Sequence, residues 1–509
     1  MEKHVAILGG GAAGLSVALF LHGRRSQDRQ TIFRCTVFDA SPRLGGNCQT
    51  AYLGNQAFVE PFADLGVNDF NTERYKLLMG VLEKLDGFGY PILHRPIIDS
   101  TSWSTSPGAS GNDRICYTDR DIKGRHCTGA GISASILMKI VDDWDRFQAI
   151  SRDVIHDPHY AQMTVDEFIA EMEFSREFCE YNLFSCIGGM YFVDDRSPRS
   201  MPIRAIMNYY HLQKGVGLNP KVNSSLGSAS SSSSPRHYFV NGASDWIRQL
   251  SRYLQDQGVE MRLGEVPLAR LMDCGGWRVV TSASQRTGRE TFDYVISAVH
   301  ADTVQNVVQT GLPVGLSSLL EKFSYSESTA IVHDDASVLP DDPNAWSTYN
   351  LAINNPACRD KFPYVITYLE QKHHGQDLNS PPFVTLAPCG LEEESRIYEM
   401  LALPSQDRVK ATVKFRHNRL SMDSVNAQKL LRHLQGQNNF YVTGGWTIGV
   451  GLHEEILAMS REVALRMRGF FLPGVHDEGY RDDQPSYLPK YIRDTFADTP
   501  ELFPAGFWD

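Results

Sequence analysis

The chain has 509 residues and a mass of 57.1 kDa, with 42% hydrophobic and 21% charged residues. This is the balance of a globular protein, and it excludes disordered, collagen-like and disulfide-scaffold chains. Acidic residues number 60 and basic residues 49, which gives a net charge of −11. Such a chain lacks the basic footprint that a nucleic acid or an anionic membrane surface requires, so we expect neither as a partner.

The nine cysteines include no C-x-x-C pair, so zinc ribbons, iron–sulfur clusters and redox pairs are not indicated. No other spaced ligand set stands out, and no metal site is predicted. The adjacent histidines at 373 and 374 are expected at the surface. The start of the chain lacks a basic region and a cleavage site, and no stretch has the length of a membrane span. We therefore expect a cytoplasmic protein with reduced thiols and no integral membrane segment, of unknown oligomeric state.

The first motif is a strand, a glycine turn and a helix. Residues 4–8 form an apolar run of strand formers, Gly9 to Gly14 follow as G-G-G-A-A-G, and residues 15–21 are apolar throughout. This is the setting that the dinucleotide-binding pattern G-x-G-x-x-G requires. Gly9 allows the tight turn, Gly11 lets the backbone approach a pyrophosphate, and Gly14 lets the helix pack closely on the strand. The N–H groups at the helix start would face the phosphate oxygens.

A second strand at residues 35–38 ends in Asp39. An acidic residue here is placed to bind a ribose hydroxyl, and its charge would repel the 2′-phosphate of NADP. No second G-x-G-x-x-G follows a strand elsewhere, so a separate NADPH site of this kind is not indicated. The glycine motif alone does not distinguish NAD from FAD.

The segment after Asp39 carries a family resemblance. Residues 39–47 read D-A-S-P-R-L-G-G-N, with Arg43 and the Gly45-Gly46 pair just beyond the ribose acid. This segment resembles the flavoproteins that include amine oxidases, protoporphyrinogen oxidase and phytoene desaturases. In that family an arginine and paired glycines here contact the FAD diphosphate, and glutamate is more usual than Asp39 as the ribose ligand.

The resemblance continues in patches along the chain. Residues 64–67 resemble the family's stretch beside the flavin ring, 292–298 its strand returning to the cofactor domain, and 440–446 its last cofactor strand. Residues 449–455 open a closing helix whose N-terminus, in the family, points at the flavin and would stabilise negative charge on it. The residues predicted to bind FAD are Gly9, Gly11, Ala12, Ala13, Gly14, Asp39, Ala40, Arg43, Gly45, Gly46, Asn47, Leu65, Gly66, Val67, Val266, Ala298, Gly444, Gly445, Trp446, Gly451 and Leu452.

The candidate catalytic side chain is His453, at the start of the closing helix. It could hydrogen-bond the flavin or exchange a proton with the substrate near neutral pH, or it could be a capping or buried structural histidine. Glu454 and Glu455 are expected to stabilise a helix N-terminus electrostatically. Trp446 could wall the pocket or belong to the core.

The predicted fold class is α/β, with a Rossmann-like FAD-binding domain interleaved with a mixed α+β substrate domain, as in amine oxidases. The cofactor domain is expected at residues 1–70, 236–300 and 425–472, and the substrate domain at 71–223 and 301–424. Residues 99–131 are predicted to be an irregular insertion, 224–235 a serine-rich loop and 473–509 a C-terminal tail. A helix capped by Asn71 or Thr72 is expected to end at Gly87.

These features predict an FAD-dependent oxidoreductase that takes a hydride from a small organic substrate. The first hypothesis is an amine-oxidase-like enzyme with oxygen as acceptor. A second is a desaturase or double-bond isomerase acting on a lipid- or polyketide-like substrate. A third is a non-enzymatic flavoprotein that keeps FAD only as part of its core.

Overall fold

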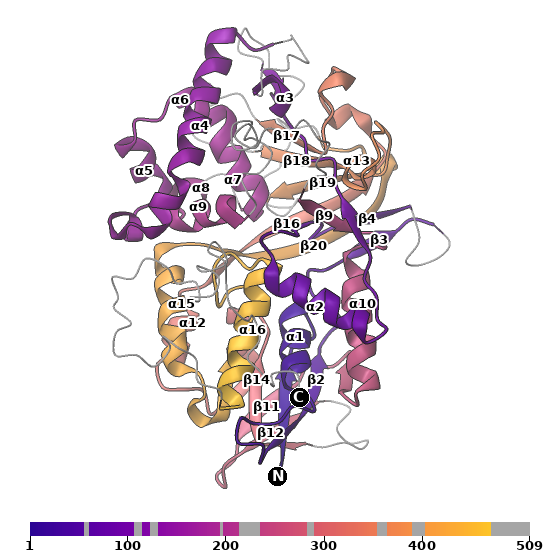
Figure 1. The fold of residues 1–509 in the computed structure, drawn as a ribbon, viewed down its shortest axis with the longest axis vertical. Coiled ribbons are helices and arrows are strands. Elements are labelled where there is room, and N and C mark those ends of the chain that lie inside the picture. The colour runs from indigo at the N-terminus through magenta and orange to yellow at the C-terminus, as the bar shows by residue number, and fades with distance from the viewer. Residues whose placement is uncertain are drawn as a thin grey trace.

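The computed structural model describes residues 1–54, 61–105, 115–122, 131–193, 197–212, 235–281, 290–353, 364–388 and 403–469. The predicted tail at 473–509 and nearly all of the predicted serine-rich loop lie outside this part of the chain. Figure 1 shows two lobes, the lower built around β1, α1 and α16 and the upper around β16 to β19.

The lower lobe contains a five-stranded parallel sheet in the order β10-β2-β1-β14-β21. The chain leaves this sheet after β2, forms the first part of the upper lobe, and returns to the sheet as β10. The parallel pairing agrees with the predicted βαβ unit, because parallel neighbours need a crossover connection. The strands are β1 (Glu2–Leu8), β2 (Ile32–Asp39), β10 (Glu260–Leu263), β14 (Tyr294–Ser297) and β21 (Phe440–Val442).

Both faces of this sheet are buried, and alternate residues of β1 serve different cores. Val5 and Ile7 pack in the larger core with α1, while Ala6 and Leu8 pack in a second core against β11 and β12. A strand buried on both faces reads as a continuous apolar run, as residues 4–8 do. The second core lies against a four-stranded sheet, β13 (Thr291–Phe292), β12 (Trp277–Val280), β11 (Leu268–Leu271) and β15 (Val308–Thr310), and helices α11 (Ala301–Val307), α12 (Leu316–Leu320) and α15 (Met422–Leu434).

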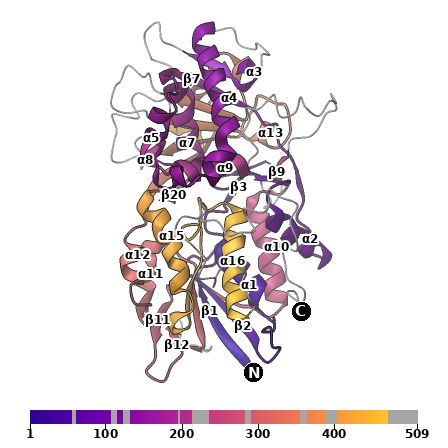
Figure 2. The same cartoon turned by 60° about the vertical axis from the view of Figure 1, so that its left-hand side comes forward.

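Helix α1 (Ala12–Leu21) is buried along its whole length. It packs between α16 (His453–Met467) and α10 (Ala243–Asp256), as Figure 2 shows. Helix α2 (Lys76–Gly87) rests on α16 and α10, although the predicted domain limits assign it to the substrate domain. Asn71 closes a turn ahead of α2 by accepting the N–H groups of Glu73 and Arg74. The helix itself starts later than the predicted cap implies.

The upper lobe is built on a seven-stranded sheet in the order β20-β16-β19-β18-β17-β7-β8. Its neighbours are antiparallel except for β17 and β7, which are parallel. Its strands are β20 (Val409–Arg419), β16 (Ser324–His333), β19 (Phe383–Pro388), β18 (Tyr364–Leu369), β17 (Tyr349–Ile353), β7 (Thr101–Thr105) and β8 (Cys116–Thr118).

Strands β7 and β8 correct the prediction of an irregular insertion at residues 99–131. Trp103 and Tyr117 are fully buried and stack on each other at 5.0 Å between ring centroids. Threonine and aromatic residues favour a half-buried pleated surface, and the high serine and glycine content of the segment obscured that signal. Residues 106–114 and 123–130 of this segment lie outside the described chain.

Helices cover the remaining side of the upper lobe, and small sheets join the lobes (Figure 1). Trp144 of α4 packs edge-on against Tyr210 of α9 and near Phe147, which forms an aromatic core. The helices are α3 (Asp119–Ile122), α4 (Ala134–His156), α5 (Val165–Glu171), α6 (Arg176–Phe178), α7 (Phe184–Tyr191), α8 (Ser197–Ser200), α9 (Ile203–Leu212) and α13 (Glu370–His373). The joining strands are β3 (Thr50–Tyr52), β4 (Phe62–Asp64), β5 (Phe70–Asn71), β6 (His94–Pro96) and β9 (Arg236–Phe239).

Candidate active site

The glycine turn between β1 and α1 holds positions where a side chain cannot fit. Gly9 has φ +113°, and a Cβ there would lie 2.8 Å from the carbonyl oxygen of Ala298. A Cβ on Gly14 would lie 1.9 Å from the carbonyl oxygen of Gly9. Both glycines are therefore required by the fold itself, because the turn and the helix approach their neighbours too closely for any larger residue.

At Gly11, by contrast, no described residue stands in the way of a side chain. Its backbone is extended, and a Cβ there would come no closer than 3.9 Å to any described residue, with Gly46 the nearest. Gly11 is also the N-cap of α1, so no side chain caps the helix at that position, and the first turn has no acidic residue. The free space beside this helix start is part of a large cavity between the two lobes.

Asp39 and the glycine pair form the neighbouring wall of the cavity. The Asp39 carboxylate accepts N–H groups of Gly10 at 2.6 Å and of Ser41 at 2.7 Å. The amide of Gly45 donates to the carbonyl of Gly10 at 2.9 Å, which holds the loop against the glycine turn. Gly45 and Gly46 both have positive φ. The end of β2, the glycine turn and the loop at 45–47 thus lie side by side, as the motifs predict.

The N-terminus of α16 lies at the same edge of the sheet, and a carboxyl group of its first turn folds back onto the segment that leads into the helix. Glu455 Oε2 accepts the N–H groups of Val450, Gly451 and Leu452 at 3.0, 2.9 and 3.0 Å. Burial raises the pKa of the Glu455 carboxyl to about 7, although these hydrogen bonds act to lower it. A carboxyl group therefore already lies at the positive end of this helix, and the approach of this end to a flavin stays a prediction.

Glu454 serves a different helix. Its two carboxylate oxygens accept the N–H groups of Leu77 and Leu78, at 2.9 and 3.0 Å, in the first turn of α2. Burial raises its pKa to about 7 as well. The expected helix-terminal role of these two glutamates is correct in kind, but they satisfy the N-termini of two helices far apart in sequence.

His453 is buried in the cavity wall beside Cys48. Its Nε2 lies 3.4 Å from the Cys48 sulfur, and its Nδ1 has no hydrogen-bond partner among the described residues. Burial lowers the pKa of the imidazole to about 4 and raises that of the thiol to about 12. Both groups are therefore neutral at neutral pH. If the thiol donates to Nε2, the hydrogen on Nδ1 is available to the cavity.

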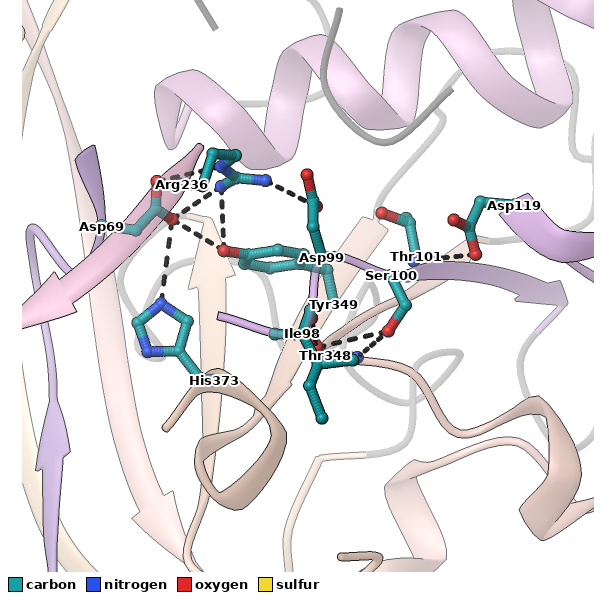
Figure 3. Close-up of polar contacts among 10 residues, drawn as sticks. All are labelled: Asp69, Ile98, Asp99, Ser100, Thr101, Asp119, Arg236, Thr348, Tyr349 and His373. Atoms are coloured by element: carbon teal, nitrogen blue, oxygen red, sulfur yellow. Dashed lines mark hydrogen bonds and ion pairs between the residues drawn. The ribbon is translucent and has the colours of Figure 1, made fainter. Parts of the chain in front are cut away.

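The far end of the cavity is aromatic and holds a buried ionic cluster (Figure 3). Arg236 donates to both oxygens of Asp69, at 3.2 and 2.6 Å, to Asp99 at 2.9 Å, and to the hydroxyl of Tyr349 at 2.9 Å. Tyr349 in turn donates to Asp69 at 2.7 Å. The guanidinium holds the pKa of Asp69 well below its usual range against the effect of burial. Two carboxylates thus share one guanidinium. The surrounding aromatic lining residues are Tyr75, Trp103, Trp144, Tyr209, Tyr210, Tyr349 and Tyr368.

Most of the residues predicted to bind the cofactor line this one cavity, but five do not. Leu65 is buried outside the cavity lining, and Gly14 packs against the carbonyl group of Gly9. Ala40 and Arg43 are exposed, and Val266 is 55% exposed beyond β10. Trp446 is both a wall and a core residue, because it lines the cavity and its ring nitrogen donates to Val299 at 2.8 Å. The predicted residues that line the cavity are Gly9, Gly11, Ala12, Ala13, Asp39, Gly45, Gly46, Asn47, Gly66, Val67, Ala298, Gly444, Gly445, Trp446, Gly451, Leu452 and His453.

Sequence reasoning missed the aromatic end and its ionic cluster. Asp69 stands two residues after the predicted cofactor stretch at 65–67, which is a weak local signal, but its partner Arg236 is 167 positions away. Nothing in the sequence pairs them. The expectation that His373 and His374 lie at the surface is wrong, since they are 0% and 6% exposed. They are buried because α13 lies between the joining strands and the upper sheet.

Among the described residues, no helix is both long and apolar enough to cross a bilayer.

Comparison with known proteins supports this arrangement at the level of the fold. A family model described as an NAD(P)-binding Rossmann-like domain matches residues 7–85. No curated protein matches the sequence.

Solved structures cover nearly the whole chain at low identity. Putrescine oxidase bound to putrescine has a TM-score of 0.60 and 11% identity over 92% of this chain and 99% of its own. Cyclohexylamine oxidase from Brevibacterium oxydans IH-35A has 0.57 and 12% over 92% and 99%. A CLA-producing fatty acid isomerase from P. acnes has 0.58 and 11% over 91% and 98%. The chain therefore has the amine-oxidase-like α/β fold that the motifs predict.

Proposed function

We propose that the cavity binds FAD and that the protein is an FAD-dependent oxidoreductase. The observation that carries the proposal is the free space at Gly11, beside a helix N-terminus that no side chain caps at its first position. A pyrophosphate fits this place because backbone N–H groups and the helix dipole attract an anion. Asp39 stands where the adenosine ribose would lie, and Gly45 and Gly46 complete the wall.

The remaining length of the cavity favours a flavin dinucleotide. Besides the glycine turn, the cavity is lined by Asn47, Val67, Gly444 and His453 and by the aromatic residues of the upper lobe. An extended dinucleotide with its redox ring near α16 would leave the aromatic end for a substrate. Bound FAD would supply the acceptor for a hydride from a substrate carbon.

The substrate that fits the aromatic end best is an amine. Two carboxyl groups, Asp69 and Asp99, face the single guanidinium of Arg236, and their side chains are 7% and 19% exposed. Tyrosine and tryptophan faces attract cations, and the effect is stronger where water is excluded. A protonated amine would complement both features. The cavity residues would orient the amine, and His453 would hold or move a proton through Nδ1.

A desaturase or double-bond isomerase is the second candidate, because the same cavity is also lined by Met190, Leu351 and Ile366. An apolar chain would lie against these side chains. One of the solved structures with this fold is a fatty acid isomerase. The two candidates differ in whether oxygen is consumed.

Purified full-length protein tests the proposal. We expect yellow protein with FAD bound, bleaching of the flavin when a primary amine is mixed anaerobically, and peroxide with a carbonyl product when oxygen is admitted. Conversion of an unsaturated fatty acid without oxygen uptake would favour the second candidate. Colourless protein that takes up no FAD would overturn both. Bound FAD that no substrate reduces would leave a purely structural role for the flavin.

The role of His453 is tested separately. Replacing His453 with Ala should slow flavin reduction by roughly 10² to 10⁴-fold while FAD remains bound, if the imidazole transfers a proton. His453→Asn keeps a polar group of similar shape and should recover packing without recovering the rate. Reduction kinetics equal to the wild type in both variants would assign the side chain a structural role. Stopped-flow absorbance under anaerobic conditions measures the rate.

A further inference from the structure

A cluster of ligand-forming side chains lies behind the aromatic end of the cavity. Glu370 and His373 stand one turn apart on α13, and His374 follows at once. Glu370 and His373 are 0% exposed and His374 is 6% exposed. One carboxylate oxygen of Glu370 and one ring nitrogen of each histidine lie within 4.8 Å of one another. These are residue types that bind divalent metal ions, brought together in the interior.

The hydrogen bonds of the protein leave several of these atoms unused. Glu370 Oε2 accepts the N–H of Asp64 at 3.3 Å and lies 3.3 Å from His374 Nε2. Its Oε1, however, has no partner among the described residues, and neither has either ring nitrogen of His373. The Asp69 carboxylate and His373 Nε2 form a long ion-pair contact of 3.8 Å, beyond hydrogen-bond distance, which Figure 3 draws as a dashed line. Buried polar atoms without partners cost free energy, so native proteins seldom leave several together.

The carboxyl groups of this cluster have no lysine or arginine partner among the described residues. Asp64 is buried, has one unpartnered oxygen, and approaches Glu370 through its backbone. No lysine or arginine among the described residues pairs with Asp64 or Glu370, and Arg236 is already engaged by Asp69 and Asp99. Buried carboxylates are found paired or bound to metal ions. The basic groups beside these carboxyl groups are the histidines themselves, with His374 3.3 Å from Glu370 and His373 3.8 Å from Asp69.

We propose that Glu370, His373 and His374 bind one divalent transition-metal ion of the Zn²⁺ type. Two ligand atoms on a tetrahedral zinc are roughly 3.3 Å apart, given metal–ligand distances near 2.0 Å. Glu370 and His374 already have this separation, and the His373 ligand nitrogen, which lies within 4.8 Å of the other two ligand atoms, reaches it by a movement of its ring. Asp69 beside Nε2 would orient that ring with Nδ1 toward the metal, as carboxylates commonly do for ligating histidines.

The site would lie where two segments meet, although its three ligands all come from α13 and the residue after it. Asp64 and Asp69 flank the stretch beside the proposed cofactor, whereas α13 follows β18 of the upper sheet. A metal held here would therefore stabilise the contact between the lobes. This inference does not depend on the proposed redox function.

Metal binding to the full-length protein tests the inference. After treatment with a chelator, Zn²⁺ alone is titrated by calorimetry, and bound zinc is counted by elemental analysis after desalting. We expect one zinc per chain and a higher melting temperature with zinc. Co²⁺ in place of zinc should give visible ligand-field bands of tetrahedral ligation, which needs no variant. Absence of stoichiometric binding by folded wild-type protein would overturn the proposal.

Variants locate the metal. Glu370→Gln and His373→Asn keep side-chain size, and each should weaken zinc binding at least 100-fold while the metal-free protein remains folded by circular dichroism. His94→Gln is the matched control, because His94 and His237 form a second histidine pair, with Nδ1 atoms 2.7 Å apart, away from this cluster. Loss of zinc in His94→Gln, or wild-type affinity in Glu370→Gln, would contradict the assignment. If His373→Asn does not fold, Glu370→Gln and the cobalt spectrum decide.

Discussion

Two helices, α1 and α16, begin at the same edge of the parallel sheet, and their N-termini are treated in opposite ways. At α1, glycines keep the space beyond the first turn open, and no acidic side chain stands in that turn. At α16, Glu455 accepts three N–H groups just before the helix. An open N-terminus attracts an anionic ligand, whereas a capped one contributes to stability. The difference supports α1 as the phosphate end of the proposed cofactor site and gives α16 a carboxyl group whose charge depends on pH.

The largest expected effects are at Gly14 and Gly11 beside the N-terminus of α1, where one substitution should affect stability and the other FAD binding. Gly14→Ala places a Cβ 1.9 Å from the carbonyl of Gly9, so we expect a loss of roughly 4 kcal/mol or more in unfolding free energy. Gly11→Ala meets no described residue within 3.9 Å and should leave the melting temperature of the apoprotein unchanged while weakening FAD binding by roughly 100-fold. Urea unfolding and FAD titration measure the two effects. Equal stability of both variants would contradict the geometry of the turn, and full FAD retention by Gly11→Ala would contradict the phosphate site.

The second-largest effect on stability is expected at Glu454 of α16, which caps α2. Glu454→Ala removes the acceptor for two buried N–H groups, and we expect a loss of about 3 kcal/mol in unfolding free energy. Glu454→Gln retains one acceptor oxygen and should lose about half as much. Denaturant unfolding of the apoprotein checks both. A change below about 0.5 kcal/mol for the alanine variant would show that water or a rearrangement satisfies α2.

The contribution of Glu455 to the stability of the protein should also depend on pH. The folded pKa of Glu455 is raised from 4.5 to about 7, so the folded state binds the proton more tightly, and the stability from this group falls as pH rises through that window. The pKa values of His237, His333, His417 and His453 are lowered from 6.5 to about 4, which acts in the opposite sense. Glu455→Gln should therefore gain about 2 kcal/mol relative to wild type between about pH 5 and pH 8. A difference that is flat with pH would mean that Glu455 is already ionised when folded.

The smallest expected effect is on the redox potential of the proposed flavin. Above its pKa of about 7, the Glu455 carboxylate, which lies behind the cavity wall on the N–H groups of Gly451 and Leu452, disfavours added negative charge. Glu455→Gln should favour the reduced flavin by roughly 1 kcal/mol at high pH. The difference from wild type should vanish below that pKa. Dye-equilibrated reduction at several pH values measures it, and a shift independent of pH would indicate altered packing instead of lost charge.

Local patterns predicted which segments meet along one side of the cavity, and their role as a cofactor site stays a prediction. The turn from Gly9 to Gly14, the acid at Asp39 and the pair at Gly45 are each defined by a few consecutive residues, and the structure places them along one cavity. Strand β7 was missed because its serines and threonines suggested a loop, although Trp103 and Thr101 suit a buried strand. The serine and threonine content of the segment was given more weight than its strand-like residues.

By itself, the sequence determined the strand–turn–helix unit, the absence of room at Gly9 and Gly14, and the apolar character of β1, because these depend on steric and hydrophobic rules acting over a few residues. Only the tertiary structure decided that Glu454 caps α2, that Arg236 joins Asp69 and Asp99, and that Glu370, His373 and His374 meet in the interior. Those contacts join side chains whose separation along the chain carries no periodic signal. Their energies arise from burial and charge, which exist only once the two lobes have packed together.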